Sequence, residues 1–396
     1  MQYSIYFQSS GLFGQISTKS VENVKPRRKK WIGVGLKNLR EVSDSLMEKM
    51  KGLIEIDGSF GEGGGQILRT ALSLSAILKK PFTIHHIRSK RKNPGLQAQH
   101  LEAVEALAQI TEAHTEGVKF GSQKITFNPN KILSGDYQFE VKTAGSVTLI
   151  LQAIFLPLCL AQGTSTVTLV GGTHVPWSPP FHYFSQVLLP HLDSMGVSVD
   201  ATIDKWGFYP RGGGTVKLEI KPVHELRPVN LIERGSLKKV RGLSAVSALP
   251  KHVAERQREQ ALKRIQRELS IDAEITILYD APSIGQGSFL FLVTEYGKVL
   301  AGFSSLGQKG KPAEKVADEA VDALKDYIST EGCLDPHLAD QLVPFMALAK
   351  GNCSFTTTQM TDHLLTNLWV ISHFLKGKVR ESGEIRRPGR VEFLIE

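Results

Sequence analysis

The order of the predicted secondary-structure elements limits most strongly how this chain can fold. From residue 53 onward, apolar runs typical of β-strands alternate with segments in which apolar residues recur every three or four positions, as in amphipathic helices. The same order of elements is predicted three times, ending near residues 128, 220 and 395. We therefore expect an α+β fold of three repeated units, each a four-stranded sheet with two helices. Because the units share little sequence, this prediction depends on element order alone.

A different pattern interrupts this order between the second and third units. Predicted strands and two helices, 252–269 and 313–328, indicate a smaller inserted α+β domain. The predicted domains are a basic N-terminal extension (1–52), the first two units (53–232), the inserted domain (233–330) and the third unit (331–396). One face of the helix at 252–269 is interpreted as a solvated surface because it is rich in basic residues: Arg256, Arg258, Lys263, Arg264 and Arg267.

Positive charge is concentrated at the N-terminus. The formal net charge is +9, and residues 1–52 contain ten lysines and arginines but only four acidic residues. The rest of the chain is nearly balanced, so binding to a nucleic acid would have to depend on a local basic patch. Residues 1–52 also lack sustained apolar periodicity. We expect this extension to be disordered or to precede a physiological start at Met47 or Met50.

The sequence lacks the features of a membrane protein and of a disulfide-rich secreted protein. No stretch of about 18 apolar residues without charge is present. The three cysteines form no CxxC pair, which indicates neither a zinc site nor a disulfide framework. We therefore predict a soluble, cytoplasmic protein with no membrane partner, and its oligomeric state stays open.

Residues 57–69, DGSFGEGGGQILR, predict the end of a strand, a tight loop and the start of a helix. The glycines permit positive φ and close approach of backbone N–H groups, and the positive end of a helix favours an anion such as phosphate. Glu62 lies within this loop, where a carboxylate would repel a phosphate unless a divalent metal lay between them. The spacing matches neither a Walker loop nor a dinucleotide-binding motif. A nucleotide–metal site and a glycine turn that only caps a core helix are about equally consistent with this stretch.

Two predicted helix starts near the C-terminus carry groups that could take part in catalysis. His363 begins a helix after Thr361 and Asp362, either of which could be the N-cap. The helix dipole disfavours an imidazolium there, so we expect a neutral ring nitrogen that can attack phosphorus. Asp340 begins the preceding helix and could orient this imidazole or hold a metal. A buried or capping histidine and an N-cap carboxylate are the structural alternatives.

A basic cluster at residues 88–92 is the strongest local anion site predicted outside the N-terminal extension. Gln99 and His100 follow it on the next predicted helix. Paired guanidinium groups suit a terminal phosphate. The alternative is a loop that only solvates the end of a strand.

Several motifs in fixed order resemble one known family. They are DGSFGEGGGQILR, IRSKRKNPGLQAQH, KTAGSVTLILQ, GGTHVPWSPP, GFYPRGGG, and LADQLVPFMALA with TDHLLTN. Together they resemble the RNA 3′-terminal phosphate cyclase family from about residue 53 to the C-terminus. The resemblance implies an ATP-dependent enzyme that converts an RNA 3′-phosphate into a 2′,3′-cyclic phosphate through a covalent histidine–AMP, releasing pyrophosphate and then AMP. It also implies the fold of three units with an inserted domain.

The resemblance further implies roles for individual residues. His363 would be the nucleophile that takes up AMP, and Glu62 would bind a divalent metal, Mg²⁺ or Mn²⁺. Four residues would contact the phosphates of the substrate: Arg69, Arg88, Arg91 and Gln99. Six residues would form the ATP site: Gln152, Pro179, Tyr183, His337, Asp340 and Gln341. The family often has a tyrosine where this chain has His337, which stacks on adenine with less area and implies weaker ATP binding or a relaxed base preference.

Three other functions are considered beside the cyclase. A non-catalytic branch of the same family acts in ribosomal RNA processing, and the presence of His363, Glu62, Arg69 and Asp340 argues against it. A transferase of the enolpyruvyl type would explain the arginines but predicts no covalent AMP. A module that only binds RNA fits poorly with the nearly balanced charge of residues 53–396.

Overall fold

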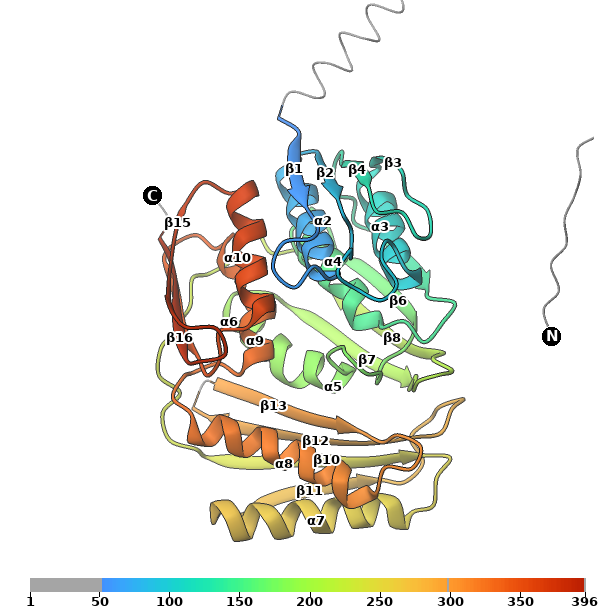
Figure 1. The fold of residues 1–396 in the computed structure, drawn as a ribbon, viewed down its shortest axis with the longest axis vertical. Coiled ribbons are helices and arrows are strands. Elements are labelled where there is room, and N and C mark those ends of the chain that lie inside the picture. Colours follow the sequence, from blue (N-terminus) through green and yellow to red (C-terminus); the bar gives the residue numbers. More distant parts are fainter. Residues whose placement is uncertain (1–51, 298, 395–396) are drawn as a thin grey trace, which may run out of the picture. The chain divides into compact units, whose positions relative to one another are not determined.

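The structure is a computed structural model that describes residues 52–297 and 299–394. The predicted N-terminal extension lies outside these residues, apart from Gly52. The described chain is an α+β fold with four sheets of four strands each (Figure 1). This confirms the fold class expected from the sequence.

The three repeated units follow one order of elements. The first contains β1 (Ile54–Asp57), α2 (Gln66–Leu78), β2 (Phe82–His85), α3 (Ala98–Thr111), β3 (His114–Glu116) and β4 (Ile125–Asn128). The second contains β5 (Asp136–Glu140), α4 (Val147–Cys159), β6 (Ser165–Gly171), a continuous helix of α5 (Phe181–Tyr183), η1 (Phe184–Leu188) and α6 (Leu189–Ser194), β7 (Val199–Lys205) and β8 (Gly214–Ile220). The third contains β9 (Asn230–Leu231), α9 (Pro336–Met346), β14 (Cys353–Thr357), α10 (Asp362–Phe374), β15 (Lys378–Gly383) and β16 (Gly389–Leu394).

The sheets of the three units share one topology. Their strand orders are β1-β2-β4-β3, β5-β6-β8-β7 and β9-β14-β16-β15. In each sheet the first two strands are parallel and the remaining neighbours are antiparallel. A helix follows each of the first two strands, as parallel strands require a crossover connection. The repeat that element order predicted is therefore present in the hydrogen-bonding pattern as well.

Three short or exposed strands are absent from the sequence-based interpretation. β3 and β15 lie at sheet edges, and most of their residues are exposed, so neither shows an alternating apolar pattern. β9 has only two residues, yet it pairs in parallel with β14 in the third sheet. The inserted segment therefore lies inside the third unit, between its first strand and its first helix. The domain boundaries proposed from the sequence stay predictions.

The inserted segment forms the fourth sheet. It contains β10 (Lys239–Ser247), α7 (His252–Leu269), β11 (Ala273–Leu278), β12 (Gly287–Tyr296), β13 (Val299–Leu306) and α8 (Ala313–Ser329), and its strand order is β11-β10-β12-β13. The two helices contact each other as well as the sheet, so they cover the same face of it (Figure 1).

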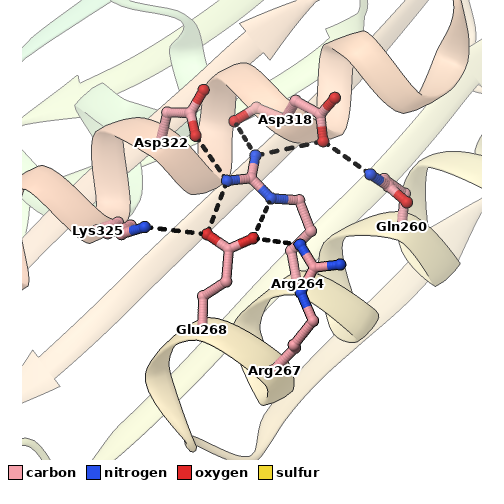
Figure 2. A network of polar contacts seen from close by, with 7 residues as sticks. All are labelled: Gln260, Arg264, Arg267, Glu268, Asp318, Asp322 and Lys325. Carbon is pink, nitrogen blue, oxygen red and sulfur yellow. Dashed lines mark hydrogen bonds and ion pairs between the residues drawn. The ribbon is translucent and has the colours of Figure 1, made fainter.

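Arg264 joins these two helices (Figure 2). Its guanidinium binds Glu268 of α7 with two hydrogen bonds of 2.9 Å, and it reaches Asp322 of α8 at 2.7 Å and Asp318 of α8 at 3.2 Å. The Arg264 side chain is only 12% exposed. The interpretation of this helix face as solvated surface is therefore wrong for Arg264, because the partners come from a helix more than fifty residues away in sequence.

Replacing Arg264 with alanine is expected to lower the free energy of unfolding by about 2–4 kcal/mol, because three carboxylates would lose their shared cation. Denaturant unfolding followed by circular dichroism measures this change. Arg267→Ala is the matched control, since this side chain is 64% exposed and bonds Glu268 alone, so we expect a loss of about 0.5 kcal/mol. Equal losses for the two variants would contradict the role assigned to Arg264.

The helices of different units contact one another and bring the functional loops together. α2 packs against both α4 and α10, and α9 packs against α10 and η1. α2 and α4 are buried on nearly every side. Because these helices begin after the first two strands of their sheets, their N-termini and the preceding loops gather around one region. No helix among the described residues is long and apolar enough to cross a membrane.

Candidate active site

The glycine-rich loop between β1 and α2 is closely surrounded by side chains from other elements. Gly61 and Gly63 have φ of +53° and +58°, which favours glycine. A side chain on Gly64 would collide with Glu62 and Arg91, and one on Gly65 would collide with His100 and Arg69. Gly64 and Gly65 therefore leave room for these four side chains, and Gly61 and Gly63 permit the turn.

Glu62 connects this loop to the two predicted catalytic segments. Its Oε2 forms an ion pair with Nη2 of Arg91, and its Oε1 lies 3.3 Å from Nδ1 of His363. The Glu62 side chain is 11% exposed. Burial alone would raise the pKa of Glu62, but His363, Arg91 and Arg69 together lower it, so the carboxylate is charged at neutral pH.

His363 lies at the start of α10 and is half exposed. Contrary to the expectation from the helix dipole, its pKa is raised, mainly because its ring contacts the Glu62 carboxylate. A full charge at 3.3 Å outweighs the partial charge of a helix end. His363 caps nothing: Thr361 is the N-cap, accepting a hydrogen bond from the Leu364 N–H. The contact through Nδ1 leaves Nε2 as the ring nitrogen that faces away from Glu62.

Asp340 supports the start of α10 rather than touching His363 directly. It accepts a hydrogen bond of 2.5 Å from the hydroxyl of Thr361, and the Asn367 amide donates to its backbone carbonyl at 2.8 Å. Asp340 is not an N-cap, because α9 begins earlier and Asp335 caps it. Burial raises the pKa of Asp340 to about 6, although Thr361 and His363 partly offset this.

Because the pKa of Asp340 is raised, the free energy of unfolding should fall as the pH rises. The folded protein holds this proton more tightly than the unfolded chain, whose pKa is near the ordinary 3.8. The contribution of this tighter proton binding to the free energy of unfolding is therefore complete below pH 3.8 and is lost as the pH rises through about 6. We expect Asp340→Asn to raise the free energy of unfolding by about 2–3 kcal/mol near neutral pH and hardly at all in acid.

Denaturant titrations of both proteins in acidic and neutral buffer would measure this difference. Asp362→Asn, which removes an exposed carboxylate at the start of α10, is the control and should not raise the free energy of unfolding by a comparable amount. A gain for Asp340→Asn of the same size at both pH values would contradict the assignment.

Arg69 is buried at the centre of a hydrogen-bond network that joins three helices. Its Nη2 donates to Gln66 at 2.7 Å, and its Nε donates to Gln152 of α4 at 2.9 Å. The amide of Gln66 in turn donates to Asn367 of α10 at 3.0 Å. Burial lowers the pKa of Arg69 to about 10, so the guanidinium remains positive at neutral pH. The sequence analysis missed Gln66 and Asn367, although Gln66 stands inside the glycine motif.

Arg88, Gln99 and His100 complete the site on the side of α3. Nη1 of Arg88 binds the backbone carbonyls of Asn93 and Gly95, which holds the basic loop in place. The Gln99 Oε1 accepts a hydrogen bond of 3.0 Å from the Ser146 N–H, so Gln99 joins the first two units. These two residues therefore have a structural contact in addition to any contact with a substrate.

His100 is a further residue of this site that was noticed in the sequence but given no role. It is buried, and burial together with Arg69 and Arg88 lowers its pKa to about 3. Its Nδ1 accepts from the Gln97 N–H, so the neutral ring carries its proton on Nε2, the nitrogen next to Gly65. His100 thus presents an uncharged donor beside the glycine loop.

A cavity lies between α2, α4, η1 and α9 next to this network. Its lining includes three of the six residues expected at the ATP site, Gln152, Asp340 and Gln341, beside apolar side chains. The other three lie outside the lining. The Pro179 carbonyl accepts a hydrogen bond of 2.7 Å from Thr148, His337 is exposed at the start of α9, and Tyr183 is 2% exposed with its hydroxyl bonded to Asp335.

Glu62 is the residue of this site that fits a metal ligand best. Its Oε1 is buried and accepts no well-aligned hydrogen bond. Within residues 52–297 and 299–394, no three histidine, cysteine or acidic side chains are grouped closely enough to hold a metal by themselves. Mg²⁺ commonly binds one or two carboxylates together with the phosphates of a substrate, and this donor set fits that arrangement only.

Comparison with known proteins supports the interpretation of the motifs. The model of a family described as RNA 3′-terminal phosphate cyclase matches residues 60–380. Proteins of that name from Methanopyrus kandleri, Staphylothermus marinus and Gloeothece citriformis are 44%, 43% and 43% identical to this chain. The alignments cover 86%, 85% and 81% of this chain and 98%, 98% and 93% of those proteins. The structure of an enolpyruvyl transferase, NikO from Streptomyces tendae, aligns with 86% of this chain and 48% of its own at 10% sequence identity. The TM-score of 0.35 is too low to indicate a relationship between the two proteins.

Proposed function

This chain belongs to the RNA 3′-terminal phosphate cyclase family, and we propose that it uses ATP to convert the 3′-phosphate of an RNA into a 2′,3′-cyclic phosphate. The observation that carries the proposal is the contact of Glu62 with His363 beside three arginines. The histidine that we assign as the nucleophile thus contacts a carboxylate that could orient it, beside positive groups suited to phosphates.

The first step is the transfer of AMP to His363. The step requires the neutral ring, in which Glu62 holds the proton-bearing Nδ1 and Nε2 has a free lone pair. This lone pair attacks the α-phosphorus of ATP, a nitrogen–phosphorus bond forms, and the bond to pyrophosphate breaks. The ring becomes positively charged as this bond forms. The Glu62 carboxylate stabilises that charge and fixes the ring orientation.

Two further transfers complete the cycle. An oxygen of the RNA 3′-phosphate attacks the phosphorus of the bound AMP, so the bond to His363 breaks and AMP becomes attached to the RNA end. The neighbouring 2′-hydroxyl then attacks the 3′-phosphorus, loses its proton and expels AMP. Activation is required because a phosphate monoester has no good leaving group. Arg69, Arg88 and Arg91 would stabilise the negative charge of the reacting phosphates, and the amide of Gln99 and the Nε2–H of His100 would donate hydrogen bonds.

A divalent metal, Mg²⁺ or Mn²⁺, would be held by Glu62 Oε1 together with phosphate oxygens. When bound, it would neutralise phosphate charge and help pyrophosphate to leave.

The nucleotide would lie between the second unit and α9. Gln152, Asp340 and Gln341 line the cavity there and offer polar groups, and Pro179 and His337 would pack on the two faces of the adenine. Tyr183 is too buried to stack on a base, but its ring meets His337 edge-on, with the ring centres 6.3 Å apart. We therefore assign Tyr183 a supporting role behind His337.

Labelling with ATP tests this function directly. Incubation with ATP that carries a radioactive α-phosphate should leave label on the protein after denaturation, stable to base and labile to acid, whereas a radioactive γ-phosphate should leave none. Added RNA with a 3′-phosphate should remove the label and acquire an end that resists phosphatase. A protein that stays unlabelled with both metals would favour the non-catalytic branch that acts in ribosomal RNA processing.

A further inference from the structure

Three exposed apolar side chains stand out on neighbouring loops of the second unit and the inserted segment. Trp177 is 96% exposed, Tyr209 is 66% exposed and Ile284 is 50% exposed. They belong to the β6–α5 loop (172–180), the β7–β8 loop (206–213) and the β11–β12 loop (279–286). Large exposed apolar groups that gather in one region usually mark a binding surface.

Hydrogen bonds from the backbone and from one arginine side chain join these three loops. The His174 N–H donates to the Gly207 carbonyl at 3.0 Å, which fixes the β6–α5 loop to the β7–β8 loop. The Trp206 N–H donates to the Pro282 carbonyl at 2.6 Å, and Nη1 of Arg211 donates to the Ile284 carbonyl at 3.1 Å. The surface is therefore built jointly by the second unit and the inserted segment.

The β7–β8 loop is also held against the second unit by glycines. A Cβ on Gly207 would collide with the Gly171 carbonyl, and a Cβ on Gly212 would lie 2.9 Å from the Ala144 Cα. Gly212 and Gly213 have φ of +62° and +67°. This GFYPRGGG loop was recognised as a motif, and none of its residues contributes to the proposed chemistry. The glycines fix the backbone of this loop, and Tyr209 and Arg211 at its tip are exposed.

This surface adjoins the active site. Ala144 precedes Ser146, whose N–H donates to the predicted phosphate ligand Gln99. Trp177 lies two residues before Pro179 in the β6–α5 loop. The β6–α5 and β7–β8 loops lie at one end of the second sheet, because β6 ends there and the antiparallel β8 begins there. Contacts therefore run from Gln99 through residues 144–146 to Gly212 in the β7–β8 loop.

We propose that Trp177, Tyr209, Arg211 and Ile284 form a platform for the single-stranded RNA nucleotides that precede the 3′-terminal phosphate. This proposal rests on the proposed function and adds a recognition surface to it. Aromatic rings stack on successive bases without regard to sequence, and an exposed arginine binds the RNA backbone. The platform adds only one positive group, Arg211, so base stacking rather than charge would supply most of its contribution to RNA binding.

The first unit provides a matched control. Its β3–β4 loop (117–124) occupies the equivalent place in the same topology and exposes Phe120, which is 67% exposed. Among the exposed large apolar residues of the described chain, Phe120 is the only one on that loop, whereas the platform combines three segments. The proposal therefore predicts that RNA bases stack on Tyr209 and not on Phe120.

The experiment compares kcat/KM for a 3′-phosphorylated dinucleotide and for an oligonucleotide of about twelve nucleotides, at fixed low salt. Tyr209→Ala and Trp177→Ala are each expected to lower kcat/KM about tenfold for the longer RNA and less than about twofold for the dinucleotide. Tyr209→Phe should retain the wild-type ratio, because stacking needs the ring alone. Phe120→Ala should also retain it. In a separate series at several salt concentrations, Arg211→Gln should weaken the salt dependence of kcat/KM for the longer RNA.

Three outcomes would overturn the platform. They are equal losses for both RNA lengths, no loss for either, and a length-dependent loss that follows Phe120 instead of Tyr209. AMP labelling of the protein by ATP alone serves as the separate readout of the proposed function. If wild type and Tyr209→Ala are labelled equally, the chemistry is intact and the RNA comparison tests the platform alone.

Discussion

Replacing His363 with alanine is expected to abolish both AMP labelling of the protein and RNA cyclisation, with a loss of at least about a thousandfold. Within residues 52–297 and 299–394, Glu62 forms ion pairs with His363 and Arg91, and of these two His363 alone has a ring nitrogen. Labelling with ATP that carries a radioactive α-phosphate measures the first step, and phosphatase resistance of the RNA end measures the whole reaction.

His373 on the same helix provides the control. It lies near the C-terminal end of α10, and its Nδ1 contacts the Trp369 carbonyl, away from Glu62. His373→Ala should therefore keep both activities. Because the His363 side chain is 46% exposed, His363→Ala should melt near the wild-type temperature. A folded His363→Ala that still accepts AMP would show that another residue is the nucleophile.

Replacing Glu62 with glutamine is expected to slow AMP transfer by about a hundredfold to a thousandfold. The amide keeps the shape of the side chain but removes the charge that orients His363 and would bind the metal. The rate of protein labelling should be measured across a range of Mg²⁺ and Mn²⁺ concentrations. We expect a lower maximal rate and a higher metal concentration at half-saturation.

Glu55→Gln is the control for this substitution. Glu55 lies on β1, shortly before the loop, and its 62% exposed carboxylate contacts His85 at the surface. It should leave labelling unchanged. If Glu62→Gln lowered the rate with no change in metal dependence, Glu62 would orient His363 without binding the metal. Full activity of Glu62→Gln would remove Glu62 from the mechanism altogether.

The sequence predicted the parts of this protein that depend on local patterns. Apolar periodicity identified the helices and the buried strands, and the recurrence of their order predicted three units with one topology. β14 was predicted with its observed bounds, because it is a short buried run in a central strand position. Edge strands such as β3 and β15 were missed, because most of their residues face solvent and carry no alternating pattern.

Contacts between units could not be predicted from sequence patterns. The dipole at the start of α10 predicted a neutral His363, but Glu62, three hundred residues earlier in the chain, raises its pKa. The basic face of α7 predicted a solvated surface, but α8 covers Arg264. His100 and Gln66 gain their places in the site only from Gly65, Arg69 and Asn367.

The sequence by itself thus determined the helices, most of the buried strands, their threefold order and the motifs of the family, because each of these depends on residues close together in the chain. The tertiary structure decided which charges meet, how far each pKa moves and which exposed side chains share a surface. These depend on distances between residues from different units, and electrostatic energy and burial change steeply over a few ångströms.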